Sequence, residues 1–332
     1  MVNKFVVGVD VGGQTSKIGV VDSEGKVLAQ DVIRSDIYGS DASAFVDALA
    51  EGIKGVISQA ESVWKAESGT GEKMEIIGVG AGAPNGNYYD GTISNAPNLA
   101  WAAEGKVEFS KMLSERLGLP VTLTNDANAA AVGEMTYGAA RGMKDFIMIT
   151  LGTGVGSGIV IGGNVVYGHD GFAGELGHVC VDRSENARSC GCGKKGCLEA
   201  YCSATGVSRT AVEWVSAATE PTLLREVLDQ KGTITSKDVY DAAKAGDDMA
   251  LRIFDYTATL LGQTFADFIA FSSPEAIVLF GGLARSKEFL YEPMVKAMED
   301  NVMKNWKGKV KIVFSSLKES DAAILGASAL AW

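Results

Sequence analysis

A glycine-centred pattern that occurs twice in the chain constrains the fold more than any other feature of the sequence. Residues 5–21 read FVVGVDVGGQTSKIGVV, in which an apolar run, a glycine turn and a second apolar run follow one another. Residues 146–161 read FIMITLGTGVGSGIVI and have the same plan. Two such strand–turn–strand segments predict two related α/β domains that face one another, although two unrelated hairpins would produce the same pattern.

Apolar runs typical of strands recur along the chain and alternate with helical patterns. The runs cover residues 5–9, 18–21, 76–79, 121–123, 146–149, 159–161, 277–280 and 310–314. Apolar residues spaced by three or four indicate helices over 45–63 and over 251–268, the second ending before Ser272-Ser273-Pro274. Strands that alternate with helices indicate an α/β architecture, and 332 residues are enough for about two domains.

Composition disfavours several classes of protein. The chain has 30 Lys and Arg against 41 Asp and Glu, and its net charge of −11 disfavours general binding to nucleic acid or anionic lipid. No segment reaches about 18 uninterrupted apolar residues, so no membrane span is expected. The start of the chain lacks a signal-peptide cleavage site and all five cysteines lie within residues 180–202, which together favour a reducing, cytoplasmic setting.

Two glycine motifs resemble nucleotide-binding fingerprints but have a different context. Residues 8–15 nearly form a Walker A loop, but Gln14 stands in place of the lysine and a strand follows instead of a helix. Residues 152–156 suggest a dinucleotide fingerprint, again ahead of a strand. Such turns can still bind phosphate, because consecutive amides without obstructing side chains form an anion-binding concavity. A pair of them could hold the phosphates of a nucleotide from two sides.

Three cysteines and a histidine predict a metal site. Cys190, Cys192 and Cys197 supply three thiolates within eight residues, and His178 lies twelve residues upstream. Zinc takes four nitrogen and sulfur ligands tetrahedrally in structural sites, so we expect a closed, structural zinc site. Cys180 competes with His178 as the fourth ligand, and reduced buried cysteines without a metal are the alternative.

Two glutamates flank these ligands. Glu175 precedes His178 by three residues, and Glu199 follows Cys197 by two. A bound metal would fix both carboxylates at one place, where they could accept hydrogen bonds from the hydroxyls of a sugar or another polyol. Two ordinary surface glutamates are the alternative interpretation.

The motifs together resemble the signature of the ROK family, named for repressors, open reading frames and sugar kinases. The signature segments are Gly171-Phe-Ala-Gly174-Glu175-Leu-Gly177-His178 and Cys190-Gly-Cys192-Gly-Lys-Lys-Gly196-Cys197-Leu-Glu199. Further blocks, in the family's order and spread over nearly the whole chain, are Asp10-Val-Gly12-Gly13, Asn98-Leu-Ala-Trp101, Asn125-Asp126-Ala-Asn128, Leu151-Gly152-Thr153-Gly154 and Gly281-Gly282.

The resemblance implies an actin-like (ribonuclease H-like) fold of two α/β domains with an interdomain cleft and a zinc-binding loop at residues 178–199. A small N-terminal domain would comprise residues 1–122 and 319–332, because the C-terminal helix is expected to return to it. Residues 123–318 would form the larger C-terminal domain.

The resemblance also implies an ATP-dependent hexose kinase that transfers the γ-phosphoryl group to the 6-hydroxyl of glucose. Asp126 would be the general base, although an Asp after an Asn at a helix start is more often an N-cap. His178 would bind zinc through one ring nitrogen and a sugar hydroxyl through the other. The residues implied to bind the hexose are Asn98, Asn125, Asp126, Glu175, His178 and Glu199.

ATP and Mg²⁺ are implied at the two glycine turns. Asp10 would hold Mg²⁺ through water, and a turn aspartate that bonds its own backbone is the alternative. Gln14 replaces the family's usual threonine, and the loop 81–89 departs from the family after its first residues, which leaves the sugar open. The residues implied to bind the nucleotide or its metal are Asp10, Gly12, Gly13, Gln14, Thr15, Gly152, Thr153, Gly154, Gly281 and Gly282.

Other functions remain open at this point. An N-acetylmannosamine or fructose kinase of the same family is one alternative, and a non-catalytic sugar-sensing regulator is another. A repressor of the family would carry a helix-turn-helix segment ahead of this body, for which a first strand at Phe5 leaves no room. The expected partners are a hexose and ATP, with no nucleic acid and no membrane, in a homodimer or homotetramer.

Overall fold

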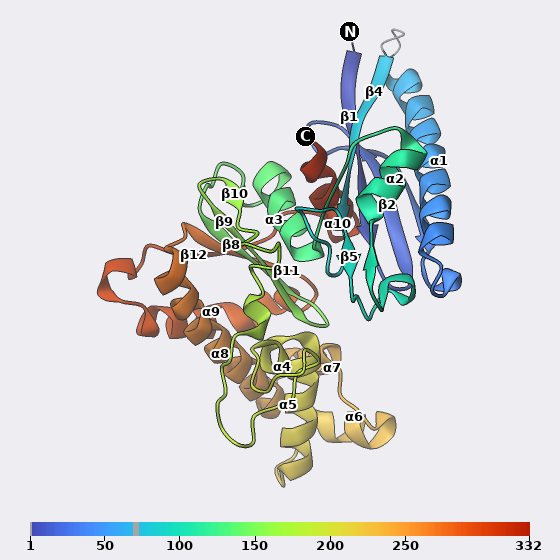
Figure 1. Ribbon diagram of the computed structural model, residues 1–332. Helices are drawn as coiled ribbons and strands as arrows, with labels where there is room; N and C mark the ends of the chain where they lie inside the picture. The colour runs from blue at the N-terminus through green and yellow to red at the C-terminus, as the bar shows by residue number, and fades with distance from the viewer. Residues whose placement is uncertain (1, 69–72) are drawn as a thin grey trace. The chain divides into compact units, whose positions relative to one another are not determined.

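The computed structural model describes residues 2–68 and 73–332 and has the predicted α/β architecture, with two five-stranded sheets (Figure 1). The chain divides into two compact units. Unit 1 comprises Met1–Met143, Asn164–Gly174 and Ser316–Trp332, and unit 2 comprises Lys144–Gly163 and Glu175–Ser315. These bounds differ from the expected ones, because the helix after residue 125 and the segment 164–174 make most of their contacts within unit 1.

The sheet of unit 1 combines an antiparallel meander with two parallel strands. Its order is β3-β2-β1-β4-β7, with β1 antiparallel to β2 and parallel to β4, and β4 parallel to β7. The strands are β1 (Val2–Val11), β2 (Thr15–Val21), β3 (Val27–Arg34), β4 (Lys73–Gly82) and β7 (Val121–Thr124). β3 was not predicted from the sequence, because it is an edge strand whose residues are mostly exposed or half-buried and so lack a clear apolar run.

The second sheet repeats the same plan. Its order is β10-β9-β8-β11-β12, with β8 antiparallel to β9 and parallel to β11, and β11 parallel to β12. The strands are β8 (Phe146–Leu151), β9 (Val155–Ile161), β10 (Asn164–Val165), β11 (Ala276–Phe280) and β12 (Lys311–Phe314). The two glycine hairpins therefore occupy equivalent places in two sheets of equivalent topology, which confirms the predicted repeat.

Both helices predicted from apolar spacing are present. The pattern over 45–63 lies in α1 (Ala42–Ser68) and that over 251–268 in α8 (Asp248–Ser272), which ends at Ser273 in the left-handed region, with φ 47°. The other helices are α2 (Phe109–Leu117), α3 (Asp126–Tyr137), α4 (Glu199–Cys202), α5 (Ala204–Ala217), α6 (Leu223–Lys231), α7 (Ser236–Lys244), α9 (Lys287–Asn301) and α10 (Glu319–Ser328). Two short strands, β5 (Ile93–Ser94) and β6 (Lys106–Val107), form a separate ribbon.

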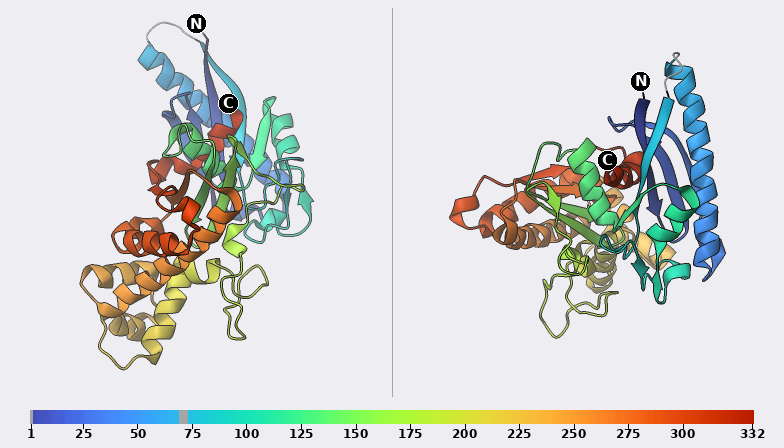
Figure 2. Two further views of the ribbon diagram at one scale, coloured as in Figure 1. Left: turned by 90° about the vertical axis from the view of Figure 1, so that its left-hand side faces the viewer. Right: turned by 45° about the horizontal axis from the view of Figure 1, so that its top comes forward.

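Alternation along β1 builds the two faces of the unit 1 sheet. Phe5, Val7 and Val9 point into the apolar core that α1 covers, whereas Val6 packs with Ile324 of α10. The two views in Figure 2 show α1 along one face of this sheet and α10 on the other. The C-terminal helix thus completes the core of the unit that contains the first strand.

Two strand glycines allow α10 to approach the sheet. A Cβ atom on Gly8 would lie 2.1 Å from the carbonyl oxygen of Ile324, and one on Gly80 would lie 1.9 Å from that of Ala327. Real carbon and oxygen atoms do not approach so closely, so any side chain at either position would displace the helix. Part of the chain's high glycine content therefore serves helix–sheet packing instead of turns.

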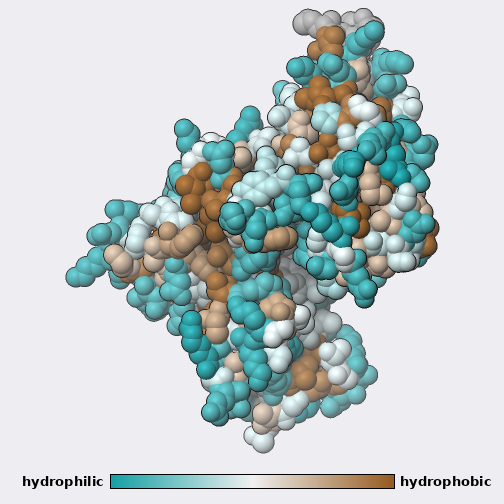
Figure 3. Space-filling view, viewed as in Figure 1, coloured by the Kyte–Doolittle hydropathy of each residue, from teal (hydrophilic) through white to brown (hydrophobic). Residues whose placement is uncertain are grey.

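On the face drawn in Figure 3, most of the surface is polar, and apolar residues form smaller groups among the polar ones. Among the residues described, no helix combines the length and the apolar character that crossing a membrane requires.

Candidate active site and metal centre

The carboxyl ends of the parallel strands in unit 1 bring together residues from three parts of the sequence. Asp10 on β1 pairs in register with Gly82 on β4, and Gly82 pairs with Thr124 on β7. Asn125 and Asp126 directly follow Thr124. A Cβ atom on Gly82 would lie 3.5 Å from the Cα of Asp126, so the start of α3 lies against the end of β4. Asp10 is thus a strand residue and not the turn aspartate of the alternative interpretation.

The N-cap of α3 is Asn125. Its Oδ1 atom accepts a hydrogen bond from the backbone N–H of Asn128 at 2.7 Å, which satisfies one of the free amides of the first turn. Asp126 is the first helical residue, and its Oδ1 accepts from the adjacent N–H of Ala127, at 2.9 Å. The interpretation of Asp126 as an N-cap is therefore wrong, and its second carboxylate oxygen is not used by the cap.

Burial alters the pKa of both carboxyl groups, and like charge adds to the shift of Asp10. Burial, together with the negative charge of Asp126, raises the pKa of Asp10 to about 6, and the ammonium group of Lys17 opposes this shift only in part. Neighbouring atoms around the carboxyl group also raise the pKa of Asp126 by desolvation, although the residue as a whole is exposed to solvent. Two carboxylates that repel one another at a sheet edge are suited to hold a divalent cation, because the cation relieves that repulsion.

The first glycine turn (residues 12–15) lies next to these carboxylates. The backbone N–H of Gly12 donates to the carbonyl of Thr15 at 3.2 Å. A Cβ atom on Gly13 would lie 2.3 Å from the carbonyl oxygen of Asn98, so the turn is in contact with the segment that carries this predicted sugar ligand. The side chains of Gln14 and Thr15 are exposed. The structure therefore gathers all the predicted site residues of unit 1 around one edge.

The four predicted metal ligands converge in unit 2. Ligand atoms of His178, Cys190, Cys192 and Cys197 all lie within 4.8 Å of one another. The sulfurs of Cys192 and Cys197 are 3.6 Å apart, and Nδ1 of His178 is 3.7 Å from the sulfur of Cys190. Tetrahedral zinc with bonds of about 2.3 Å to sulfur separates its ligands by about 3.8 Å. These distances and this donor set fit zinc.

Cys180 is excluded from this group. Its sulfur lies 3.2 Å from the carbonyl oxygen of Asp182, and its backbone pairs with that of Cys197 in a short antiparallel bridge. Gly196 makes the bridge possible, because it has φ 76° and a Cβ atom there would lie 1.9 Å from the same carbonyl oxygen. Of the two candidates for the fourth ligand, the structure therefore selects His178.

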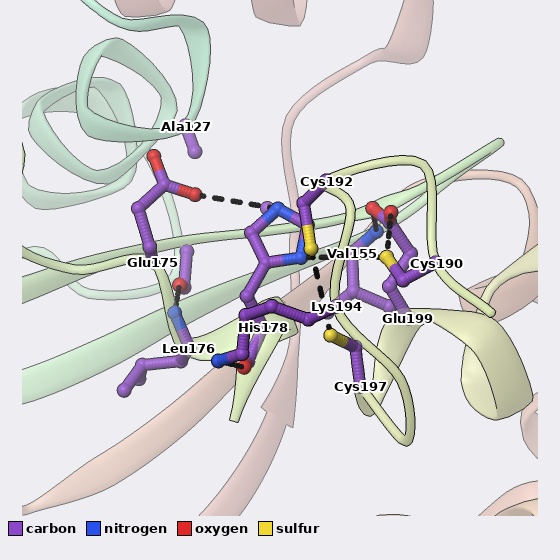
Figure 4. Close-up of polar contacts among 12 residues, drawn as sticks. Ala127, Val155, Glu175, Leu176, His178, Cys190, Cys192, Lys194, Cys197 and Glu199 are labelled. Atoms are coloured by element: carbon purple, nitrogen blue, oxygen red, sulfur yellow. Dashed lines mark hydrogen bonds and ion pairs between the residues drawn. The ribbon is translucent and has the colours of Figure 1, made fainter. Parts of the chain in front are cut away.

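Figure 4 shows how the two glutamates lie about this cluster. Nδ1 of His178 faces the cysteines, whereas Nε2 is 3.9 Å from Oε2 of Glu175, so the two ring nitrogens face different groups. Glu199 Oε1 accepts from the thiol of Cys190 at 3.4 Å, and its Oε2 accepts from the backbone N–H of Val155 at 2.9 Å. The metal cluster and both carboxylates form one continuous group.

Arg188 and Tyr201 support the metal loop and were not identified from the sequence. The Arg188 guanidinium lies 4.6 Å over the Tyr201 ring and donates to Glu213 at 2.6 Å. The Tyr201 hydroxyl donates to Asp182 at 2.6 Å and accepts from the backbone N–H of Arg188. No local pattern marks these residues, because each partner is 13 or more residues away.

The predicted nucleotide residues of unit 2 lie at the carboxyl ends of two adjacent strands. The second glycine turn (residues 152–155) follows β8, and Gly281-Gly282 follows β11, which is parallel to β8. Gly281 has φ 108°, and a Cβ atom on it would lie 2.5 Å from the carbonyl oxygen of Leu151. Glycine at this position lets the two strand ends meet.

The loop 81–89, which departs from the family pattern, is anchored within unit 1. The Tyr88 ring stacks on Tyr167 with centroids 4.0 Å apart, and Asn87 donates its amide to the carbonyl of Asp170 at 2.6 Å. Burial raises the pKa of Tyr167 to about 12. Beside this loop is a pocket of about 490 Å³, whose lining includes Asn85, Asn87, Asp90, Asn95, Lys106 and Phe172.

Comparison with known proteins gives the same family as the motifs. The sequence model of the ROK family matches residues 6–332. A glucokinase of Halalkalibacterium halodurans is 38% identical over 303 residues, which cover 90% of this chain and 86% of the relative. A glucokinase of Thermotoga maritima is 33% identical over 326 residues, covering 98% of this chain and 96% of the relative.

A solved structure extends this likeness to the fold. The ROK family glucokinase from Streptomyces griseus in complex with glucose and AMPPNP superposes with a TM-score of 0.75 at 31% identity, covering 98% of each chain. The family model matches nearly the full length of the chain, and two relatives exceed 30% identity over most of both chains. The chain belongs to the ROK family.

Proposed function

We propose that this protein is an ATP-dependent sugar kinase and that its sugar is glucose, phosphorylated at the 6-hydroxyl. The observation that carries the proposal is the carboxylate of Asp126 at the end of β7, next to Asp10 and outside the N-cap of α3. The similarity to two glucokinases, at 38% and 33% identity, supports glucose as the substrate.

Asp126 acts as the general base. Phosphoryl transfer requires an oriented acceptor hydroxyl and neutralised phosphate charge, and little covalent chemistry from the protein. As the sugar oxygen attacks the γ-phosphorus, Asp126 accepts the hydroxyl proton, and ADP leaves with the bridging oxygen. Its raised pKa favours this role, because a base whose pKa is nearer the working pH accepts a proton more readily.

Six residues are proposed to orient the sugar. Asn98 and Asn125 act with Asp126, and Glu175, His178 and Glu199 accept or donate hydrogen bonds at the other hydroxyls. His178 and the three cysteines would hold zinc through Nδ1 and the thiolates, which would leave the proton on Nε2 of His178 as a donor. The metal site is structural, because its four protein ligands leave no open position.

The nucleotide is bound by the two glycine turns and by Gly281-Gly282. The proposed residues of the two turns are Asp10, Gly12, Gly13, Gln14, Thr15, Gly152, Thr153 and Gly154. Backbone amides in these turns supply the positive ends of dipoles to the phosphates, which suits a protein of net charge −11. Asp10 would hold Mg²⁺, which would supply positive charge to neutralise the phosphates.

A coupled assay of ADP release tests the proposal across glucose, N-acetylmannosamine, N-acetylglucosamine and fructose. We expect the largest kcat/KM for glucose. A larger value for another sugar would assign the protein to that substrate. It would also be consistent with an altered sugar specificity through the loop 81–89, which departs from the family pattern. Binding of a sugar without ADP release from any of the four would favour a non-catalytic sugar-sensing regulator instead.

The oligomeric state proposed for the protein is a homodimer or homotetramer. Sedimentation equilibrium measures it directly, since one chain has a mass of 34.7 kDa. A single species at that mass over the working concentrations would contradict the proposal.

A further inference from the structure

The second glycine turn is held along one side by the segment that follows the metal loop. The backbone N–H of Ala204 donates to the carbonyl of Gly152 at 2.8 Å. The hydroxyl of Thr205 donates to the carbonyl of Thr153 at 2.9 Å. We name residues 199–205 the turn clamp, since they bond successive positions of the turn.

Glu199 completes the turn clamp from its other end. Its Oε2 atom accepts from the backbone N–H of Val155 at 2.9 Å, and a Cβ atom on Gly154 would lie 2.3 Å from the same oxygen. In Figure 4 the Glu199 carboxylate lies between the sulfur of Cys190 and Val155. The clamp therefore joins the metal cluster to the turn within unit 2.

The turn clamp is itself rigidly held. Leu198 and Cys202 are fully buried in the apolar core of unit 2, and Cys197, one of the metal ligands, directly precedes Leu198. Ser203 is the N-cap of α5 and accepts from the backbone N–H of Gly206 at 2.9 Å. Movement of the clamp would have to break this core packing or this cap.

Hydrogen bonds that restrict a glycine turn before a ligand binds reduce the entropy that the turn loses on binding. Glycine has more backbone freedom than any other residue, so a free turn would lose much conformational entropy when its amides order around a phosphate. That loss is subtracted from the free energy of nucleotide binding. Bonds to the carbonyls of Gly152 and Thr153 restrict the peptide planes whose amides would face the phosphates, and they do so before the nucleotide arrives.

We propose that the turn clamp positions the nucleotide-binding turn, with the Thr205 hydroxyl as the positioning contact. Thr205 acts through Thr153 and does not itself belong to the proposed sugar, nucleotide or metal residues. The inference rests on the proposed function, since it assumes that the second glycine turn binds nucleotide phosphates. It further implies that the metal cluster supports nucleotide binding as well as sugar binding, through Glu199.

The test is the variant Thr205→Val, which removes the hydroxyl and keeps the shape of the side chain. We expect its affinity for AMPPNP, measured by calorimetry without sugar, to fall by roughly two- to fivefold, the effect of losing one solvent-accessible hydrogen bond. The KM for ATP should rise by the same factor, while the KM for glucose and the zinc content remain unchanged. Thr205→Ser, which keeps the hydroxyl, should restore the wild-type affinity.

Thr210→Val is the matched control. Thr210 lies on the same helix, but its hydroxyl donates to the carbonyl of Gly206 within that helix at 3.0 Å. This variant should leave AMPPNP affinity unchanged. Hydrogen exchange gives a second readout, because Thr205→Val should speed exchange at residues 152–155 in the absence of any ligand, whereas Thr210→Val should not.

The outcomes separate this proposal from the proposed function. Unchanged AMPPNP affinity in Thr205→Val, or an equal loss in Thr210→Val, would overturn the role of the turn clamp and leave the kinase proposal standing. Weaker binding in Thr205→Val alone would support the clamp even if no sugar were phosphorylated. A wild-type protein that binds no AMPPNP would overturn both.

Discussion

The imidazole Nδ1 of His178 lies 3.7 Å from the sulfur of Cys190, the separation expected of two ligands that share one zinc ion. The same ring presents Nε2 toward Glu175 at 3.9 Å. A single histidine therefore links the metal cluster to the proposed sugar-binding carboxylates, and the geometry makes removal of the metal a test of both.

The metal prediction compares Cys192, a predicted ligand, with Cys180, which the sequence left as a competitor of His178. We expect elemental analysis to find about one zinc per chain in the wild type, because four ligands converge on one point. Cys192→Ser should lose the metal and most of the affinity for glucose. Cys180→Ser should retain both, because the Cys180 sulfur contacts the carbonyl of Asp182 and lies outside the cluster. Metal loss in Cys180→Ser would overturn the ligand assignment.

Asp126→Asn should separate chemistry from binding. The amide keeps the size and hydrogen-bonding capacity of the side chain but cannot accept the hydroxyl proton. We expect kcat to fall by about 10²-fold or more while the glucose dissociation constant changes little. Single-turnover kinetics and equilibrium binding measure the two quantities, and near-normal kcat would remove Asp126 as the base.

The pH dependence of kcat/KM should reflect the perturbed carboxyl groups. An ordinary aspartate stays ionised down to about pH 4, but the pKa of Asp10 is about 6 and that of Asp126 is also raised. Both groups act in the ionised form, and their ionised fraction falls as the pH drops through the raised pKa. We therefore expect kcat/KM to decline below about pH 6. The apparent pKa of this acidic limb of the pH profile belongs to Asp10 and Asp126 together, because the two groups interact. A flat profile down to pH 5 would contradict this.

Two glycine substitutions should have opposite effects on stability. Gly80→Ala places a Cβ atom 1.9 Å from the backbone of Ala327 and should lower the free energy of unfolding by about 1–3 kcal/mol or more. Gly55→Ala, on the exposed side of α1 with no atom within 4 Å of the new Cβ, should raise it by up to about 1 kcal/mol. Urea unfolding measures both. Equal changes in the two variants would contradict the close packing of α10.

The sequence predicted those parts of the fold that depend on neighbouring residues. The eight apolar runs all overlap strands of the structure, because consecutive apolar residues favour a strand with a buried face. The two hairpins could be predicted because a glycine turn separates two such runs in each. Cys190, Cys192 and Cys197 could be assigned to one site because eight residues of chain cannot separate them far. Thr205 and Tyr201 left no such local mark, since each acts on a partner that is distant in the sequence.

By itself the sequence determined the α/β class, the repeated hairpin and the set of candidate residues, because periodicity and short spacing are properties of the chain alone. Only the tertiary structure decided that His178 and not Cys180 joins the thiolates, that Asn125 and not Asp126 caps α3, and that Glu199 reaches Val155. The first and the third depend on contacts between segments that are separated in the chain, whereas the cap joins residues three apart and depends on where α3 begins. The free energy of such a contact depends on the distance between the two groups in space, and spacing along the sequence does not specify that distance.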